Sequence, residues 1–326
     1  MEENTQAIFP VMKDGKYGFI DRSGQVITDF EFDGASDFSE GLARIFVGNK
    51  VGFVNIKGEV VILPKFDMAM NFSDGLAACR VGGKAGYINK EGKFAINPAF
   101  NRVTDFAYGA ALVFEDVSSK GSFIDKQGNV LVTGKNFMVS RYSEGLINCG
   151  ENSEWGYINL TGHFVIPATY QYTREFSEGK AAVSPKKSSS GKPNRKGLYG
   201  FINKNNEMVI PPVFNGADIH FSEGLCAVWD KGYGYIDDKG TLVIPCDFNL
   251  GQHFSEGLAV FEPKGKGKTS KYGYINKAGD ITIEPIFTSA ESFKNGLASV
   301  IVSNKYQEYK YGYIDKEGNF VWEPTR

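Results

Sequence analysis

The chain has 326 residues, of which 42% are hydrophobic and 14% aromatic, so it holds ample material for a large buried core. Its 36 basic and 38 acidic residues nearly cancel, and this balance gives no reason to expect nucleic acid or an anionic membrane surface as a partner. No apolar run approaches the roughly 20 residues that span a bilayer, and the first residues lack the basic and apolar regions of a secretory signal. We therefore expect no membrane insertion and a cytoplasmic location.

The first ordered element is expected at residues 8–16, as a strand followed by a turn, after a tail of residues 1–7. It leads into Tyr17-Gly18-Phe19-Ile20-Asp21, a phrase of aromatic, Gly, aromatic, Ile and Asp or Asn that recurs nine times. The glycine, or the serine that replaces it once, stands at positions 18, 52, 86, 122, 156, 200, 234, 273 and 312. A near-constant period of this length is typical of a repeat architecture. No boundary divides the copies into groups, so we predict one domain over residues 8–326.

Each phrase predicts a short strand that ends in a tight turn. Asp or Asn opens the turn in all nine copies, and its side chain can bond the backbone two residues on. Three residues later eight copies have glycine, as at Gly92, and one has Asn206. Asn is among the non-glycine residues that best tolerate a positive φ, so this substitution indicates a left-handed turn position.

A second strand follows the turn, as at Lys93–Ile96, and we expect a proline such as Pro98 to end it, because proline removes a ladder donor. An aromatic residue comes next, and a second aromatic opens the phrase Phe-Ser-Glu-Gly-Leu-Ala, as at Phe254–Ala259. A third strand then leads to the next aromatic-Gly phrase. Glycine and proline interrupt the chain too often for helices of ordinary length.

These elements predict an all-β fold of tandem meanders with three to four strands each. Counted from the aromatic-Gly phrase, the two ends of the chain are complementary halves of one repeat, as in a propeller-like ring closed by its first and last strands. Counted from the third strand, nine whole units remain, and this count also suits an open β-solenoid or superhelix. A closed ring removes exposed strand edges that an open array must cap, so we favour the ring.

The two phrases together resemble the WG-repeat family of bacterial proteins. One copy carries a true Trp-Gly, Trp155-Gly156-Tyr157-Ile158-Asn159, and most others use Tyr. The fourth copy departs furthest, with Ser122 for glycine and no proline after Val132. The resemblance covers nearly the whole chain and implies a β-repeat scaffold without an assigned enzymatic activity.

One position in the repeat is always polar and nearly always different, although the aromatic residue after it hardly changes. We call it the polar strip and predict that it lines a binding face: Asp37, Asn71, Asp105, Arg141, Glu175, His220, His253 and Ser292. The alternative is an indifferent solvated position. His220 and His253 at matching places suggest a metal pair, but no third ligand is evident, and ordinary surface histidines explain them.

Two further sets of charges are candidates. Insertions between the third strand and the next repeat are basic and predict a basic rim that attracts anions, with solvated hairpin tips as the alternative: Lys186, Lys187, Lys192, Arg195, Lys196, Lys264, Lys266 and Lys268. The acids of the Phe-Ser-Glu-Gly phrase would recur around the array: Glu40, Asp74, Glu144, Glu178, Glu223 and Glu256. For these acids we expect a structural role, in which Ser and Glu satisfy backbone donors at the bend before the third strand.

Other chemistry is absent from the sequence. The three histidines have no aligned nucleophile, the glycines belong to turns rather than to a P-loop or Rossmann fingerprint, and no cofactor or metal is implied. We therefore expect a non-enzymatic, monomeric scaffold that binds a protein or peptide. The alternatives are a glycan- or cell-wall-binding module, suggested by the many tyrosines, and a propeller-type hydrolase or lyase, which would need clustered acids that break the repeat pattern.

Overall fold

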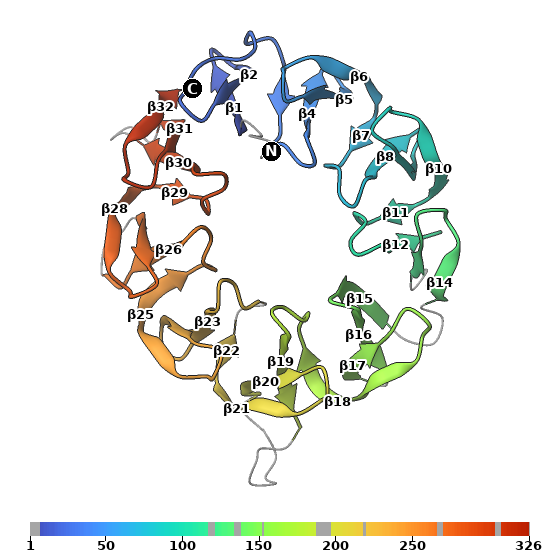
Figure 1. The fold of residues 1–326 in the computed structure, drawn as a ribbon, viewed down its shortest axis with the longest axis vertical. Coiled ribbons are helices and arrows are strands. Elements are labelled where there is room, and N and C mark those ends of the chain that lie inside the picture. The colour runs from blue at the N-terminus through green and yellow to red at the C-terminus, as the bar shows by residue number, and fades with distance from the viewer. Residues whose placement is uncertain are drawn as a thin grey trace, which may run out of the picture. The chain divides into compact units, whose positions relative to one another are not determined.

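The computed structural model describes residues 7–116, 121–133, 138–151, 153–186, 197–217, 220–265, 270–303 and 308–325. Within these ranges every regular element is a β-strand (Figure 1). The described residues accordingly include no helix that could cross a bilayer. The prediction of an all-β meander repeat is confirmed, and most of the predicted N-terminal tail lies outside the described residues.

Four kinds of strand recur in a fixed order: edge strand, third strand, aromatic-Gly strand and second strand. The edge strands are β3 (Gly34–Ala35), β7 (Met68–Ala69), β11 (Arg102–Val103), β15 (Met138–Ser143), β22 (Gly216–Ala217) and β29 (Ser289–Ala290). The third strands are β1 (Ile8–Lys13), β4 (Leu42–Val47), β8 (Ala77–Val81), β12 (Ala111–Phe114), β16 (Leu146–Glu151), β19 (Lys180–Pro185), β23 (Cys226–Trp229), β26 (Leu258–Pro263) and β30 (Ala298–Ser303).

The other two kinds form the hairpin that the aromatic-Gly phrase predicts. The aromatic-Gly strands are β2 (Lys16–Asp21), β5 (Lys50–Asn55), β9 (Lys84–Ile88), β13 (Ser122–Ile124), β17 (Glu154–Ile158), β20 (Tyr199–Asn203), β24 (Tyr233–Ile236), β27 (Tyr272–Asn276) and β31 (Tyr309–Ile314). The second strands are β6 (Val60–Phe66), β10 (Phe94–Phe100), β14 (Val130–Thr133), β18 (Phe164–Thr173), β21 (Met208–Phe214), β25 (Leu242–Gly251), β28 (Ile281–Phe287) and β32 (Phe320–Thr325).

Contacts divide the chain into two compact units. The first comprises residues 1–139, 160–162 and 321–326, and the second comprises residues 140–159 and 163–320. In the first unit β1 pairs with β2, and three four-stranded sheets follow: β3–β6, β7–β10 and β11–β14. In the second unit the strands β18 and β25 each run on as the edge strand of the next meander, and they join two meanders into the seven-stranded sheets β15–β21 and β22–β28. Whether the array is a ring or an open spiral stays a prediction.

The turn chemistry is as predicted from the sequence. The Asn55 side-chain Oδ1 accepts from the backbone N–H of Lys57 at 2.9 Å, two residues on. Asn206 has a φ of 64°, the left-handed conformation that its glycine counterparts adopt, such as Gly240 at 84°. The fourth copy forms the same hairpin despite its departures, because Ser122, Phe123 and Ile124 pair with β14.

The prediction that proline ends the second strand is wrong. Pro64 lies inside β6, which continues to Phe66, and the same holds for the prolines of the other long second strands. The ladder to β5 shifts register between Val51↔Phe66 and Phe53↔Ile62, so the second strand bulges opposite Gly52. Proline is tolerated at such a bulge because no ladder donor is needed there. The strand therefore bends at the proline and resumes pairing.

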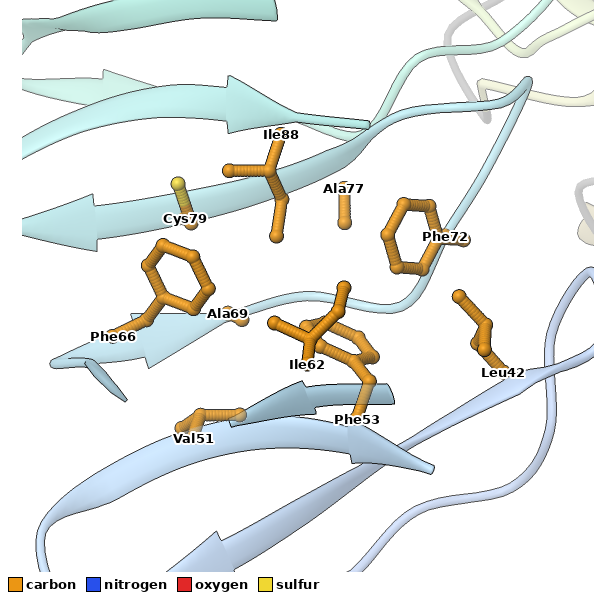
Figure 2. Close-up of a cluster of buried hydrophobic side chains, with 10 residues drawn as sticks. All are labelled: Leu42, Val51, Phe53, Ile62, Phe66, Ala69, Phe72, Ala77, Cys79 and Ile88. Carbon is orange, nitrogen blue, oxygen red and sulfur yellow. The ribbon is translucent and has the colours of Figure 1, made fainter. Parts of the chain in front are cut away.

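The hydrophobic core of the first unit lies between successive sheets. One cluster joins Phe53 and Ile62 of the sheet β3–β6 to Phe72 and Ile88 of the repeat that contains β7–β10, and Figure 2 shows these side chains facing one another. The Phe53 and Phe72 rings meet edge to face with centroids 5.0 Å apart. The same pairing recurs within the second unit between Tyr274 and Phe293, at 4.8 Å. In each of these places one sheet thus completes the core of the next repeat within the same unit.

The first and last segments of the chain meet inside the first unit. Beside the turn glycine Gly92 lies Ile62 of the preceding second strand, and beside Gly24 lies Val321 of β32. The Trp322 ring stacks on Phe30 with centroids 5.8 Å apart, and the Thr325 hydroxyl donates to the carbonyl oxygen of Met12. Figure 1 shows the C-terminus beside the β1–β2 hairpin. β32 therefore supplies for the first repeat the contact that the preceding second strand supplies elsewhere.

Candidate functional site

The repeated acids lie in tight turns that precede the third strands. In one such turn Ser73 and Leu76 exchange backbone hydrogen bonds of 2.9 and 3.2 Å, and Asp74 between them has a φ of 55°. The other acids adopt similar left-handed values, which L-residues other than glycine seldom adopt. We call these the acidic turns, at residues 39–42, 73–76, 143–146, 177–180, 222–225 and 255–258.

Each acidic turn is bonded to the turn of the next repeat. The carboxylate of the acidic turn accepts from the backbone N–H of the glycine in the next repeat's turn. The serine hydroxyl of the acidic turn donates to the carbonyl oxygen of the aromatic residue that precedes the next repeat's turn. The carboxylate bonds are Gly75 to Glu40 (3.1 Å), Gly109 to Asp74 (2.5 Å), Gly179 to Glu144 (3.2 Å), Gly224 to Glu178 (3.0 Å), Gly257 to Glu223 (3.1 Å) and Gly296 to Glu256 (2.9 Å). The serine bonds are Ser39 to Phe72, Ser73 to Phe106, Ser143 to Phe176, Ser177 to Phe221, Ser222 to Phe254 and Ser255 to Phe293.

A lysine from the hairpin turn of that next meander completes most of these contacts. The ion pairs are Lys90–Glu40 (3.4 Å), Lys126–Asp74 (2.6 Å), Lys204–Glu144 (3.1 Å), Lys277–Glu223 (3.0 Å) and Lys316–Glu256 (3.2 Å). Burial alone raises the pKa of Asp74, but the hydrogen bonds from Lys126 and Gly109 outweigh it and hold the pKa below its usual value. The expected structural role of the acids is therefore supported, with two corrections. The backbone donors belong to the following repeat and not to the acid's own bend. The serine hydroxyl satisfies a backbone carbonyl oxygen and not a backbone donor.

Asp238→Lys is expected to stabilise the protein by about 0.5 kcal/mol, within the range of exposed ion pairs. Asp238 occupies the place of the lysine at the one acidic turn that lacks it, opposite Glu178, so the substitution replaces a like charge with an opposite one. Urea unfolding of both proteins measures the difference. The control is Glu317→Lys, which makes the same charge reversal in another hairpin turn, one position after the lysine Lys316. An equal gain in the two variants would contradict the pairing.

Each polar-strip residue directly precedes the repeated aromatic residue, which is buried in most repeats and half-buried at Phe38 and Tyr142. Asp37 and His253 are exposed, whereas Asn71, Asp105, Glu175, His220 and Ser292 are half-buried, and the side chain of Arg141 lies outside the described residues. The strip therefore includes both solvent-facing and partly enclosed side chains. That it binds a partner stays a prediction.

Two strip residues of the first unit surround an arginine that the sequence analysis did not single out. Arg44 of β4 donates from Nε to Asn71 Oδ1 at 2.8 Å and from Nη1 to the Ala69 carbonyl oxygen at 3.0 Å. Ser36 Oγ lies 3.0 Å from the same Asn71 oxygen. Asp105 acts on Arg44 through its charge. Most other third strands have Ala, Leu or Val where β4 has Arg44, so this break in an apolar pattern was the available signal.

Asp105 is the most unusual strip residue electrostatically. Its Oδ1 atom is buried and has no hydrogen-bond partner in the described structure. Burial raises the pKa of this carboxyl above 3.8, and the Arg44 charge opposes the shift without cancelling it. Burial likewise lowers the pKa of Arg44. The cluster of Ser36, Arg44, Asn71 and Asp105 thus holds a desolvated acceptor to which no group of the described structure donates.

Asp105→Asn is expected to change the pH dependence of stability. Between pH 3.8 and the raised folded pKa, folding takes up a proton at Asp105, so its contribution to stability falls as the pH rises through that window. The Asp105→Asn variant lacks this pH-dependent contribution, so its stability relative to the wild type should increase from about pH 4 toward about pH 7. Urea unfolding of both proteins at several pH values in this range measures the difference. Asp37→Asn, at an exposed strip position, is the control. A difference between Asp105→Asn and wild type that is constant with pH would contradict the assignment.

The second unit has a related buried group. Asn148 of β16, at the position of Arg44, donates from Nδ2 to the Thr173 hydroxyl at 2.8 Å and to the Thr173 carbonyl oxygen at 3.0 Å. Its Oδ1 is buried without a partner in the described structure. The Tyr157 hydroxyl donates to the Arg174 carbonyl oxygen at 2.6 Å, next to the strip residue Glu175. The strip therefore lies beside buried polar groups in both units.

The basic rim is described in part only and stays a prediction. Lys186 pairs with Glu154, and Lys264 lies 3.2 Å from Asp247, whereas the other basic-rim residues Lys187, Lys192, Arg195, Lys196, Lys266 and Lys268 lie outside the described residues. Among the residues described, no three His, Cys, Asp or Glu side chains gather as metal ligands, around His220 and His253 or elsewhere. Burial raises the pKa of the Cys79 thiol to about 12, so this thiol stays protonated and unreactive at neutral pH.

The fold and the turns define an all-β tandem-repeat protein. The profile described as WG containing repeat matches residues 17–50, 52–84, 86–116, 155–184, 199–228, 233–266 and 272–306, which is more than half of the chain. The chain belongs to this family. The fourth and ninth aromatic-Gly phrases fall outside the matched segments, although both form the expected strands, β13 and β31.

Comparison with solved structures finds distant likenesses. Kluyveromyces lactis Hsv2p is 10% identical, with a TM-score of 0.39, over 86% of this chain and 97% of that chain. Pyrococcus horikoshii acylaminoacyl peptidase is 8% identical, with a TM-score of 0.44, over 98% of this chain and 52% of that chain. The extracellular domain of a putative one-component system from B. thetaiotaomicron is 10% identical, with a TM-score of 0.35, over 98% of this chain and 56% of that chain. No curated protein matches the sequence.

Proposed function

We propose that this protein is a non-enzymatic scaffold that binds a protein or peptide partner through its polar strip. The observation that carries the proposal is the contrast between two sets of polar groups. The repeated acids, serines and lysines bond to neighbouring repeats, so they hold the framework together. The strip residues vary from repeat to repeat, and Asp105 among them keeps a buried oxygen without a donor. A constant framework that presents a variable surface suits recognition.

The proposal is tested by capture of a partner from native lysate on immobilised protein. The strip variant carries Asp37→Ala, Glu175→Ala and His253→Ala, which avoids the buried Arg44 cluster. The matched control carries Glu91→Ala, Gln127→Ala and Glu317→Ala, three exposed residues in hairpin turns. We expect a partner that the wild type and the control retain equally and that the strip variant retains at least about tenfold less, as expected when central contacts of an interface are lost. Empty eluates from the intact wild type, or equal losses in both variants, would refute the proposal.

Glycan binding is the alternative, and the burial of the repeated aromatics argues against its simplest form. Tyr87, Tyr157, Tyr235 and Tyr274 are fully buried, and each donates its hydroxyl to a backbone carbonyl oxygen. A glycan would instead need exposed aromatics, which among the described residues are Phe94, Tyr108, Phe164, Tyr172, Trp229, Tyr309 and Tyr311. Binding on a glycan array that is lost in Tyr309→Ala and Tyr311→Ala variants would favour this alternative over the peptide scaffold.

A further inference from the structure

A small pocket in the first unit is lined by residues other than those of the polar strip, although Met70 directly precedes the strip residue Asn71. It has a volume of about 130 Å³ and opens where the edge strand β7 and the third strand β8 face β11. Its buried lining includes Ala78, Cys79 and Ala85, and the exposed side chains of Met68 and Met70 border it. An apolar cavity of about 150 Å³ accommodates a benzene molecule, so this pocket suits one apolar side chain of a ligand. Methionine adapts readily to the shape of such a group.

Two arginines, Arg80 and Arg102, also line the pocket and give it a positive charge. Arg80 donates from Nη1 to the Gly83 carbonyl oxygen at 2.6 Å and from Nη2 to the Asn101 carbonyl oxygen at 2.8 Å. The Arg102 guanidinium lies over the Phe114 ring, 3.9 Å from its centroid. Both cations are therefore held in place by groups that leave their charge unneutralised.

Neither arginine forms an ion pair with an acid of the described chain. The nearby Asp67 is bonded to Lys50 at 2.6 Å and to the backbone N–H of Gly82 at 2.9 Å, so its charge is already engaged. A guanidinium has five N–H donors, and Arg80 uses two of them on carbonyl oxygens. The donors that remain match the two oxygens of a carboxylate.

We propose that this pocket binds the C-terminus of a partner peptide, with an apolar last side chain in the cavity and the α-carboxylate on Arg80 and Arg102. The carboxylate and the side chain of a C-terminal residue leave the same carbon atom, which fits an apolar pocket bordered by paired cations. The inference rests on the proposed function in that it takes the partner to be a peptide. It concerns other residues than the strip, and the strip variant changes none of the pocket's lining, so the two can fail separately.

The experiment uses the full chain and an N-terminally fluorescein-labelled pentapeptide, Gly-Ser-Gly-Ser-Leu, with a free carboxylate. The same peptide with a C-terminal amide removes the charge, and the peptide ending in Gly removes the apolar side chain. N-acetyl-leucine, added as a competitor, distinguishes a peptide terminus from a free small acid. Fluorescence anisotropy gives the affinities, and ¹³C-methyl-methionine NMR locates the site through the Met68 and Met70 signals.

We expect the free-acid Leu peptide to bind and the amide and Gly peptides to bind at least about tenfold more weakly, since each loses a principal contact. Arg80→Gln and Arg102→Gln should each weaken binding about fivefold or more, whereas Lys57→Gln, which removes an exposed charge elsewhere in the unit, should not. Arg80→Gln also removes the two bonds to backbone carbonyl oxygens. If that loss destabilises the protein, Arg102→Gln is the variant that decides the test. Peptide binding should shift the Met68 and Met70 methyl signals and leave the other methionines unchanged.

Four outcomes would each overturn the assignment. The acid and amide peptides could bind equally, or no peptide could bind at millimolar concentration. The NMR shifts could occur at other methionines only, or Lys57→Gln could weaken binding as much as the arginine variants do. If N-acetyl-leucine displaced the labelled peptide at the same concentration as the unlabelled peptide does, the ligand would be a small acid and not a peptide terminus. If peptide binding survives in the strip variant while lysate capture fails, the proposed function fails and the pocket stands. If lysate capture depends on the strip but not on Arg102, the reverse holds.

Discussion

Replacement of Gly86 by alanine is expected to destabilise the first unit by about 3 kcal/mol or more, at the upper end of the cost of overpacking. A Cβ atom at Gly86 would lie 2.5 Å from the Ile96 carbonyl oxygen and 2.7 Å from the Pro98 nitrogen. Both obstacles are backbone atoms of the bulged second strand β10, so no side chain can move aside. Thermal unfolding followed by circular dichroism should show a midpoint several degrees below that of the wild type, as such a loss implies.

Gly265→Ala is the matched control for this prediction. A Cβ atom at Gly265 would meet no heavy atom within 4 Å, and this glycine does not have a positive φ, so alanine should be neutral there. Ser122 shows why a side chain is tolerated at one copy: its second strand lacks the proline, and Ser122 pairs directly with Thr133. A Gly86→Ala protein as stable as the wild type would show that the second strand can retreat from the aromatic-Gly strand.

Phe72→Ala is expected to cost about 3–5 kcal/mol, the range for removal of a large aromatic side chain from a packed core. Phe72 is fully buried and meets Phe53 of the preceding sheet edge to face, as seen in Figure 2. Its loss therefore opens a cavity between two sheets. Urea unfolding monitored by tryptophan fluorescence and circular dichroism would measure the change.

Leu63→Ala provides the comparison for Phe72→Ala. Leu63 is 73% exposed on the second strand β6, so its truncation should change stability by no more than about 0.5 kcal/mol. If the two variants lost equal stability, the core would not lie between the sheets as described. If Phe72→Ala were harmless, the edge-to-face pair with Phe53 would carry little of the packing.

Much of the fold could be predicted from residues whose backbone requirement is local. Asn206 revealed a left-handed turn because few other residues replace glycine there, and its φ of 64° agrees. The edge strands could not be predicted in the same way, since an element as short as Met68–Ala69 leaves no alternating pattern. The bulge at Pro64 was also missed, because a proline that ends a strand and one that bends it look alike in sequence.

The candidate site was less predictable than the fold. The polar strip emerged from comparison of the repeats, but its partners lie in a neighbouring repeat: Arg44 and Asn71 are 27 positions apart in the sequence. The predicted structural role of the acids was correct, but the position of their bonding partners was wrong for the same reason. Glu40 accepts from the backbone N–H of Gly75, 35 residues on. The pocket at Arg80 and Arg102 had no sequence signal, since residues from two repeats create it.

The lysine–carboxylate contacts bear on how such a chain can change its length. Lys90 lies 50 residues after Glu40, and Lys204 lies 60 residues after Glu144, so each bond spans more than one period of the sequence. Where Tyr108 replaces the acid, Leu160 replaces the lysine, and the pair is lost together. When a gene gains or loses the codons of one whole repeat, the remaining acids and lysines still pair between neighbouring repeats. Unequal recombination between repeats would therefore preserve these bonds wherever the crossover falls, provided that it joins equivalent codons.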